Sequence, residues 1–167
     1  LKLKEIIISL IFTALIRTLI GLVPAIILTS PLFGISILEL GLPLLLLFLS
    51  LYIFGITLGL FVSAGLMRFG PSFENIAWSS LFLLAPLGCI YYPIEILPNF
   101  FQIIAKCLPL VYIFDETRNI LLNGFINYEN LKQAYFLNFI YLFCGIALFY
   151  FSFLKARIKG TLINMGE

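Results

Sequence analysis

The chain has 167 residues, of which 62% are hydrophobic and 11% are charged, and its formal net charge is +2. A water-soluble domain of this length has about half of its residues apolar and about a quarter charged. The composition therefore excludes a soluble globular protein and predicts one surrounded mainly by lipid. The few lysines and arginines form no basic stripe, so nucleic acid is excluded as a partner.

The first apolar run, residues 6–28, is predicted to cross the bilayer although Arg17 lies near its middle. It holds fifteen Ile, Leu, Val or Phe residues. Each favours insertion by roughly 0.3–0.6 kcal/mol, against about 3 kcal/mol for the arginine, so the sum favours a span. Intramembrane charges usually face a cavity or a partner, and Glu39 and Glu95 are the candidate partners of Arg17. The alternative is that Arg17 reaches back to the membrane interface.

Three further charge-free runs follow along the chain. They cover about 28, 20 and 22 residues, and a helix needs about 20 to cross a bilayer. We therefore expect spans at residues 40–66, 76–92 and 134–154, with a tail at residues 155–167.

The second predicted span carries Gly55, Gly59 and Ser63 at a spacing of four residues. Small side chains at this spacing let two helices approach closely. We expect a packing surface here, either against another helix of the same subunit or, as the alternative, against a second copy of the chain.

The segment before the last span, residues 93–124, is more apolar than an ordinary loop and is interrupted by prolines. Two short helices are predicted in it, one over residues 99–107 after Pro98 and one over residues 111–122 after Pro109. Two short helices that meet at a proline predict a re-entrant hairpin. The expected fold is thus a single all-α, polytopic transmembrane domain with four spans and this hairpin before the last.

The lysines and arginines set the predicted orientation, because cytoplasmic loops carry an excess of them. With the N-terminus inside, the cytoplasmic side holds more of them than the outer side. Both termini are therefore expected in the cytoplasm, with the chain a multi-pass protein of the cell membrane. The inner set is Lys2, Lys4, Arg68, Lys155, Arg157 and Lys159, and the outer set is Lys106, Arg118 and Lys132.

The chain resembles the permease subunits of type-2 ATP-binding cassette (ABC) exporters in RFGPSFENIAW (68–78), LLAPLGCIYYPIEILP (83–98), LPLVYIFDETRNILLNG (108–124) and the closing LKARIKGTLINMGE. It is similar to the last four of that family's six spans. The N-terminal part of the family domain is therefore expected to be missing, in line with a start at leucine. The resemblance implies a homodimer or a paired permease that exports an amphiphile such as a lipid-linked glycan or a drug. A separate cytoplasmic ATPase subunit would supply the energy.

Arg118 matches an arginine that recurs in this stretch of the family, and Asp115 lies three residues before it, within reach on a helix. Together with other polar or proline positions they are candidates for the gate or translocation path, the alternative being a solvated interfacial face. Arg68 and Glu74 are candidates for the ATPase-side loop, unless they are ordinary solvated charges. The candidate path residues are Arg17, Tyr92, Pro93, Glu95, Pro98, Pro109, Asp115 and Arg118.

No catalytic set is evident in the sequence. There is no GxxxxGK[ST] phosphate loop and no histidine to act as a base or metal ligand, so we expect a transport subunit without enzymatic activity, cofactor or metal. Cys89, Cys107 and Cys144 are expected to fill small apolar spaces, and a Cys89–Cys107 disulfide is the alternative. The alternative function is a non-transporting membrane scaffold or assembly protein, or a truncated inactive permease.

Overall fold

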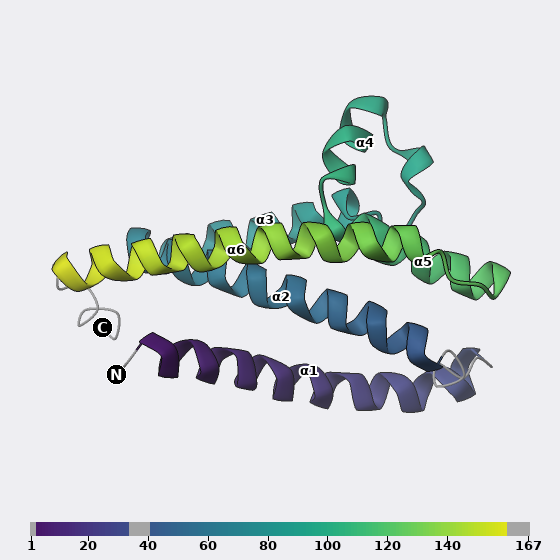
Figure 1. Ribbon diagram of the computed structural model, residues 1–167, viewed down its shortest axis with the longest axis horizontal. Coiled ribbons are helices and arrows are strands. Elements are labelled where there is room, and N and C mark those ends of the chain that lie inside the picture. The colour runs from purple at the N-terminus through teal and green to yellow at the C-terminus, as the bar shows by residue number, and fades with distance from the viewer. Residues whose placement is uncertain (1–2, 34–40, 160–167) are drawn as a thin grey trace. The chain divides into compact units, whose positions relative to one another are not determined.

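The computed structural model describes residues 3–33 and 41–159. These residues form helices and contain no strand, which confirms the all-α class for this part of the chain (Figure 1). The elements are α1 (Leu3–Phe33), α2 (Gly41–Phe69), α3 (Phe73–Leu87), the short 3-10 helix η2 (Ile94–Ile96), α4 (Asn99–Lys106), α5 (Pro109–Asn123) and α6 (Tyr128–Lys159).

Within the described residues, three helices are long and apolar enough to cross a membrane. The candidate spans are Ile7–Thr29 in α1, Gly41–Phe69 in α2 and Tyr128–Ile158 in α6. The spans expected at 6–28, 40–66 and 134–154 fall on these helices. The chain is therefore of the multi-pass membrane type.

The expected third span, residues 76–92, differs from what the structure contains. Helix α3 has 15 residues and ends at Leu87, so it is about 22 Å long, against about 30 Å for the hydrocarbon core. The helix ends because Cys89 adopts a left-handed conformation with φ 52°, which an α-helix does not contain. One continuous helix over 76–92 is therefore not formed, and three candidate spans rather than four are present in the described part.

The chain divides into two compact units, residues 1–52 and residues 53–167, and the boundary falls within α2. In the first unit the Tyr52 hydroxyl donates a hydrogen bond to the Ile11 carbonyl oxygen at 2.7 Å. This bond joins the N-terminal half of α2 to α1. The hairpin and α6 belong to the second unit, which holds the candidate site.

Helix α6 presents two chemically different faces in the second unit. The packed face mixes small residues with Leu131 and Phe149, and at Gly145 a Cβ atom would lie 3.5 Å from the Leu60 side chain of α2. Small residues allow this close approach of helices. The buried residues at helical spacing are Leu131, Ala134, Asn138, Phe149, Ser152 and Ala156.

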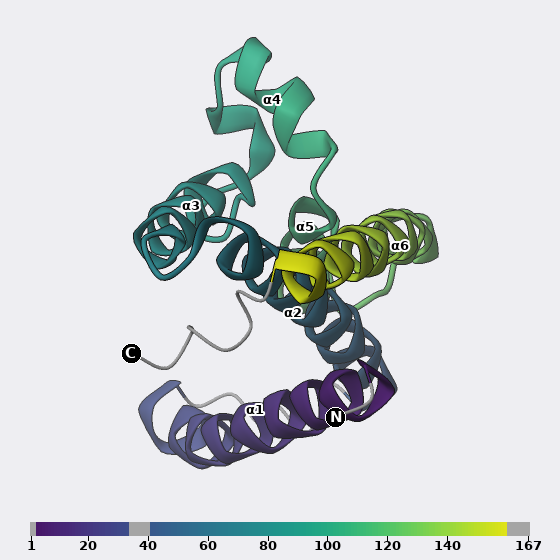
Figure 2. The same cartoon turned by 90° about the vertical axis from the view of Figure 1, so that its left-hand side faces the viewer.

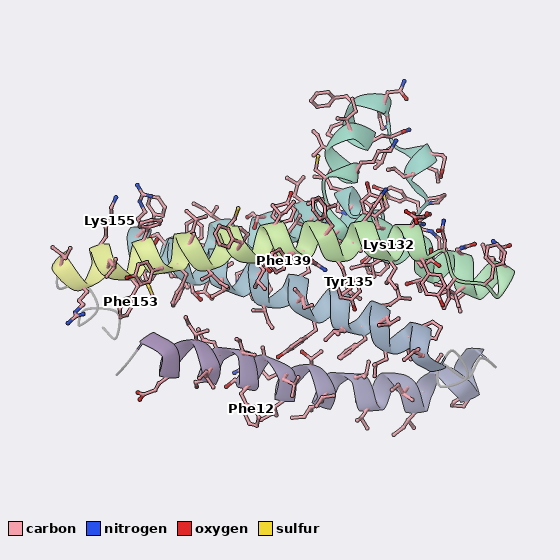
Figure 3. The ribbon with its side chains drawn as sticks, viewed as in Figure 1. Phe12, Lys132, Tyr135, Phe139, Phe153 and Lys155 are labelled. Atoms are coloured by element: carbon pink, nitrogen blue, oxygen red, sulfur yellow. The ribbon has the colours of Figure 1, made fainter. Side chains whose placement is uncertain are left out.

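The other face of α6 is exposed and carries large aromatic side chains, among them Phe136, Phe139 and Phe143. Lys132 and Lys155 lie toward the two ends of the helix, with Phe139 between them (Figure 3). The two lysines are separated by about 34 Å along the helix axis, close to the thickness of a hydrocarbon core. This face is suited to lipid.

The two short helices predicted before the last span are present. Pro98 precedes α4, Pro109 is the first residue of α5, and Gly124 ends α5 in a left-handed conformation with φ 74°. In both Figure 1 and Figure 2, α5 lies beside the beginning of α6, whereas α4 stands away from it. The prolines therefore set the boundaries of the hairpin.

Gly88, at the end of α3, allows a test of the packing between α3 and α5. A Cβ atom there would lie 2.8 Å from Leu110 Cδ1 and 2.9 Å from the Leu84 carbonyl oxygen. We expect Gly88→Ala to destabilise the fold by about 1–3 kcal/mol, as overpacking does, and to lower the Tm measured in detergent. Gly21→Ala is the matched control, because nothing lies within 4 Å of its Cβ position. Equal Tm values for the two variants would contradict the packing.

Candidate functional site: the hairpin between α3 and α6

The irregular backbone that follows α3 has several of its carbonyl groups paired with side chains. The Tyr92 hydroxyl donates to the Pro86 carbonyl at 2.9 Å. The Gln102 amide donates to the Leu97 carbonyl at 2.8 Å. Buried carbonyls outside regular helices need such partners, because each unpaired one costs free energy.

Two tyrosines pair the carbonyls at the turn between α4 and α5. The Tyr112 hydroxyl donates to the Lys106 carbonyl at 3.0 Å, and the Tyr141 hydroxyl of α6 donates to the Cys107 carbonyl at 3.1 Å. Burial raises the pKa of the Tyr112 phenol, and the nearby Cys107 adds to the rise. The phenol therefore stays protonated and keeps donating above the pH at which a free tyrosine loses its proton.

The hairpin has a small apolar core of its own. Its fully buried members come from the loop after α3, from α4 and from α5, so the core joins three segments. Cys89 contributes its thiol to this core, is one of the free cysteines, and is fully buried. The core consists of Cys89, Ala105 and Val111, with Tyr92, Ile94, Leu97 and Leu108 packed against them.

Arg118 of α5 fastens the loop after α3 to the hairpin. Its Nη1 donates to the Cys89 carbonyl oxygen at 2.9 Å, and its Nη2 lies 3.7 Å from Asp115 Oδ1. Cys89 is the residue with the left-handed backbone, a conformation that costs a non-glycine residue about 1–3 kcal/mol. The hydrogen bond from Arg118 helps to hold that conformation.

Glu116 connects α5 to the beginning of α6. Its side chain is buried, with a residue exposure of 1%. The Asn127 backbone N–H donates to Glu116 Oε1 at 2.6 Å, and the Asn130 amide lies 3.3 Å from Oε2. These bonds satisfy a buried carboxylate, as burial of a charge requires.

A pocket of about 610 Å³ opens where α5, the loop after it and α6 meet. Its wall combines one carboxylate, one guanidinium and four asparagine amides with three apolar side chains. Pockets of this size accommodate small molecules or head groups. The lining residues are Pro93, Asp115, Arg118, Asn119, Leu122, Asn123, Phe125, Asn127 and Asn130.

The structure brings some of the predicted path residues together and not others. Pro93, Asp115 and Arg118 share the pocket, while Tyr92 belongs to the hairpin core. Glu95 is exposed in η2. Pro98 and Pro109 mark helix starts. Arg17 is exposed on α1 in the other unit, and its candidate partner Glu39 lies outside the described residues.

Of the three predicted packing residues, only Ser63 is partly buried within the described chain. At Gly55 and at Gly59 nothing lies within 4 Å of a Cβ position, and both glycines are exposed, whereas Ser63 is half-buried. We expected the two glycines to pack against another helix of the same subunit. This packing is not found among the described residues.

Arg68 in the last turn of α2 and Glu74 in the first turn of α3 are both exposed. The Arg68 guanidinium lies 5.5 Å from the centre of the Phe69 ring, and Phe69 stacks on Phe73 at 5.6 Å. Glu74 lies in the first turn of α3, where a negative charge complements the helix dipole. Both charged groups are accessible from solvent.

Sequence reasoning missed the asparagines of the pocket. Asn119 accepts a hydrogen bond from the Asn123 amide at 2.7 Å, and Asn127 accepts one from the Glu129 N–H at 3.0 Å. The signal was present, because asparagines four and three residues apart flank the turn at Gly124. In the described part of the chain no three His, Cys, Asp or Glu side chains gather as metal ligands.

Comparisons with protein-family models, with curated proteins and with solved structures give no match. The resemblance to exporter permeases therefore stands on the sequence stretches alone.

Arg118→Met tests the contact between α5 and the loop after α3. The variant leaves the Cys89 carbonyl unpaired, at a cost of about 1–3 kcal/mol, and local opening should then expose the buried Cys89 thiol. We expect alkylation of Cys89 to accelerate about tenfold, as a change of about 1.4 kcal/mol predicts. The measurement uses a background in which the exposed Cys107 and Cys144 are serines.

The control for that experiment is Lys132→Met, which removes an equal charge from an exposed ion pair with Glu129. Such pairs contribute little to stability, so the Cys89 labelling rate should not change. If both variants labelled Cys89 at the rate of the parent protein, the Arg118 contact would not hold the loop.

Proposed function

We propose that this chain is a membrane-spanning permease subunit of an ABC exporter that forms the path for an amphiphilic cargo. The observation that carries the proposal is the folded hairpin between α3 and α6, whose irregular backbone has its carbonyls paired with side chains. The ATP would be hydrolysed by a separate cytoplasmic subunit. The membrane would be the cell membrane, with both termini inside.

The pairing of the carbonyls matters because lipid offers no hydrogen bonds. Non-helical backbone at membrane depth is tolerated only where protein or a water-filled path covers it. With Tyr141 of α6 donating to the Cys107 carbonyl, the turn between α4 and α5 can lie at that depth. A re-entrant hairpin of this kind would line a path rather than serve as an ordinary loop.

The side chains around the hairpin fit a cargo with both apolar and polar parts. Large apolar side chains of the loop and of α4 are exposed, among them Tyr91, Phe100 and Ile103. The polar pocket is lined by Asp115 and Arg118 of α5. An amphiphile can contact the apolar surface with its chains and the polar groups with its head.

Transport requires a contact that differs between two states of the permease. The bond from Arg118 to the Cys89 carbonyl is such a contact in the proposal, because it joins α5 to the end of α3 through one donor. Movement of α3, driven by the ATPase at the loop with Arg68 and Glu74, would break it. The path beside the hairpin would then open.

A second permease subunit would complete the path. Gly55 and Gly59 lie exposed on α2 with open space at their Cβ positions. Exposed small residues at this spacing suit the close approach of another membrane helix. We assign this surface of α2 to the contact with a second copy or a paired permease.

The ATPase partner is tested by purification from cells that make the chain with its natural neighbours. We expect a protein with a GxxxxGK[ST] loop to co-purify, and Glu74→Lys to reduce its recovery about tenfold, because a charge reversal at an interface costs more than 1 kcal/mol. Glu129→Lys is the matched control, since Glu129 is also an exposed carboxylate in the first turn of a helix. Recovery of the chain without any ATPase would favour a non-transporting scaffold instead.

The four-span arrangement is tested by the accessibility of single cysteines in a background that lacks the native three. We propose that α3 and the residues up to 92 together complete a crossing. Ser72→Cys and Arg157→Cys should then label only from the inside, and Asn99→Cys only from the outside. Labelling of Ser72→Cys and Asn99→Cys from the same side would mean that α3 does not cross.

A further inference from the structure

The pocket of about 610 Å³ between α5 and α6 holds two opposite charges with unused bonding capacity. Arg118 Nη2 is buried and makes no hydrogen bond within the described part of the chain. Its distance to Asp115 Oδ1 is 3.7 Å, longer than the 2.7–2.9 Å of a charge-assisted hydrogen bond. Buried donors without a partner are rare in folded proteins, so this nitrogen requires an explanation.

Asp115 is likewise incompletely bonded. Its Oδ2 lies 3.4 Å from the Asn130 amide nitrogen, and its side chain is 46% exposed. An ionised carboxylate accepts about four hydrogen bonds, so Asp115 can accept more from a ligand. The pocket wall therefore combines the positive charge of Arg118, whose side chain is 26% exposed, with a carboxylate that can accept further hydrogen bonds.

The charge balance selects the class of ligand. An anion on Arg118 would face Asp115, and Glu116 lies buried behind it with its carboxylate bonded to Asn127 and Asn130. A cation on Asp115 would face Arg118. A ligand with a negative and a positive charge a few ångströms apart can place the negative charge at Arg118 and the positive charge at Asp115. Neither charge of the ligand then lies against a group of the same sign.

The position in the chain indicates that this ligand is a lipid head group. The pocket lies at the first turn of α6, where the candidate span Tyr128–Ile158 begins, and head groups lie at the ends of spans. Two apolar residues of the pocket wall, Leu122 and Phe125, are 81% and 61% exposed. They offer an apolar surface to the glycerol and acyl parts of a lipid.

The nitrogen of the head group should carry hydrogen. The pocket offers carboxylate and asparagine oxygens, which accept N–H bonds. A trimethylammonium group donates no hydrogen bond and is usually held by a cage of aromatic rings, whereas Phe125 is the one aromatic ring among the lining residues. A primary ammonium fits this wall and a quaternary one does not.

We propose that the pocket binds a phospholipid whose head group has a primary ammonium beside its phosphodiester, as in phosphatidylethanolamine. The phosphate accepts from Arg118 and the ammonium donates to Asp115. This site depends on the chain lying in a bilayer and not on transport, so it stands whether or not the proposed permease function does.

The test is native mass spectrometry of the whole chain released from nanodiscs with equal amounts of phosphatidylethanolamine, phosphatidylcholine, phosphatidylglycerol and a neutral glycosyl diacylglycerol. We expect phosphatidylethanolamine to be retained about tenfold over each of the others, as one charge-assisted hydrogen bond predicts. Asp115→Asn, which keeps the shape of the side chain, should abolish that preference and raise retention of phosphatidylglycerol. Glu129→Gln, on an exposed ion pair outside the pocket, is the control and should change nothing.

Arg118→Gln should lower the retention of phosphatidylethanolamine and phosphatidylglycerol. Asp115→Asn remains the deciding variant, because it leaves the bond from Arg118 to the Cys89 carbonyl in place. Equal retention of phosphatidylethanolamine and phosphatidylcholine would overturn the proposal. Preferred retention of the glycosyl lipid would also overturn it and would mean that the asparagines of the pocket bind sugar hydroxyls. Retention of no lipid at all would refute the site.

Discussion

The need to satisfy backbone carbonyls away from water is the constraint on which the hairpin depends. Between α3 and α6 the chain leaves the helical pattern at a loop and at the turn between α4 and α5, and each departure leaves carbonyls without a partner in the backbone. Gln102, Tyr112, Arg118 and Tyr141 donate to carbonyls there, and Tyr92 gives the Pro86 carbonyl a second bond beside that from the Cys89 N–H, all at 2.8–3.1 Å. Because three of them are tyrosines, the hairpin gains apolar surface together with its hydrogen bonds.

The two faces of α6 also have different roles. Its packed face carries Ala134, Asn138 and Ser152 beside the buried Phe149, while Phe136, Phe139 and Phe143 are exposed. A soluble helix would place its large apolar residues inside. In lipid, exposed apolar side chains carry no free-energy penalty. The residues of the inner face are therefore selected for close packing and hydrogen bonding.

Much of the fold follows from composition, because apolar length predicts spans and proline predicts helix starts. That reasoning placed α1, α2 and α6 and the two helices of the hairpin, and it paired Asp115 with Arg118 on one helix. It did not foresee that α3 ends at Leu87, since the left-handed turn at Cys89 has no signature in residue type. The pocket was also missed, because its asparagines come from α5, the loop after it and α6, which only tertiary packing brings together.

The length of α6 has a mechanical consequence. With 32 residues it measures about 48 Å, well beyond the hydrocarbon thickness of about 30 Å. Glu116 ties the hairpin to the first turn of α6, and Tyr141 ties it to a point near the middle of the helix. The helix is therefore a lever: a tilt of about 10° around its far end moves its beginning by about 8 Å. A small rotation at one side of the bilayer thus becomes a displacement several atoms wide at the hairpin.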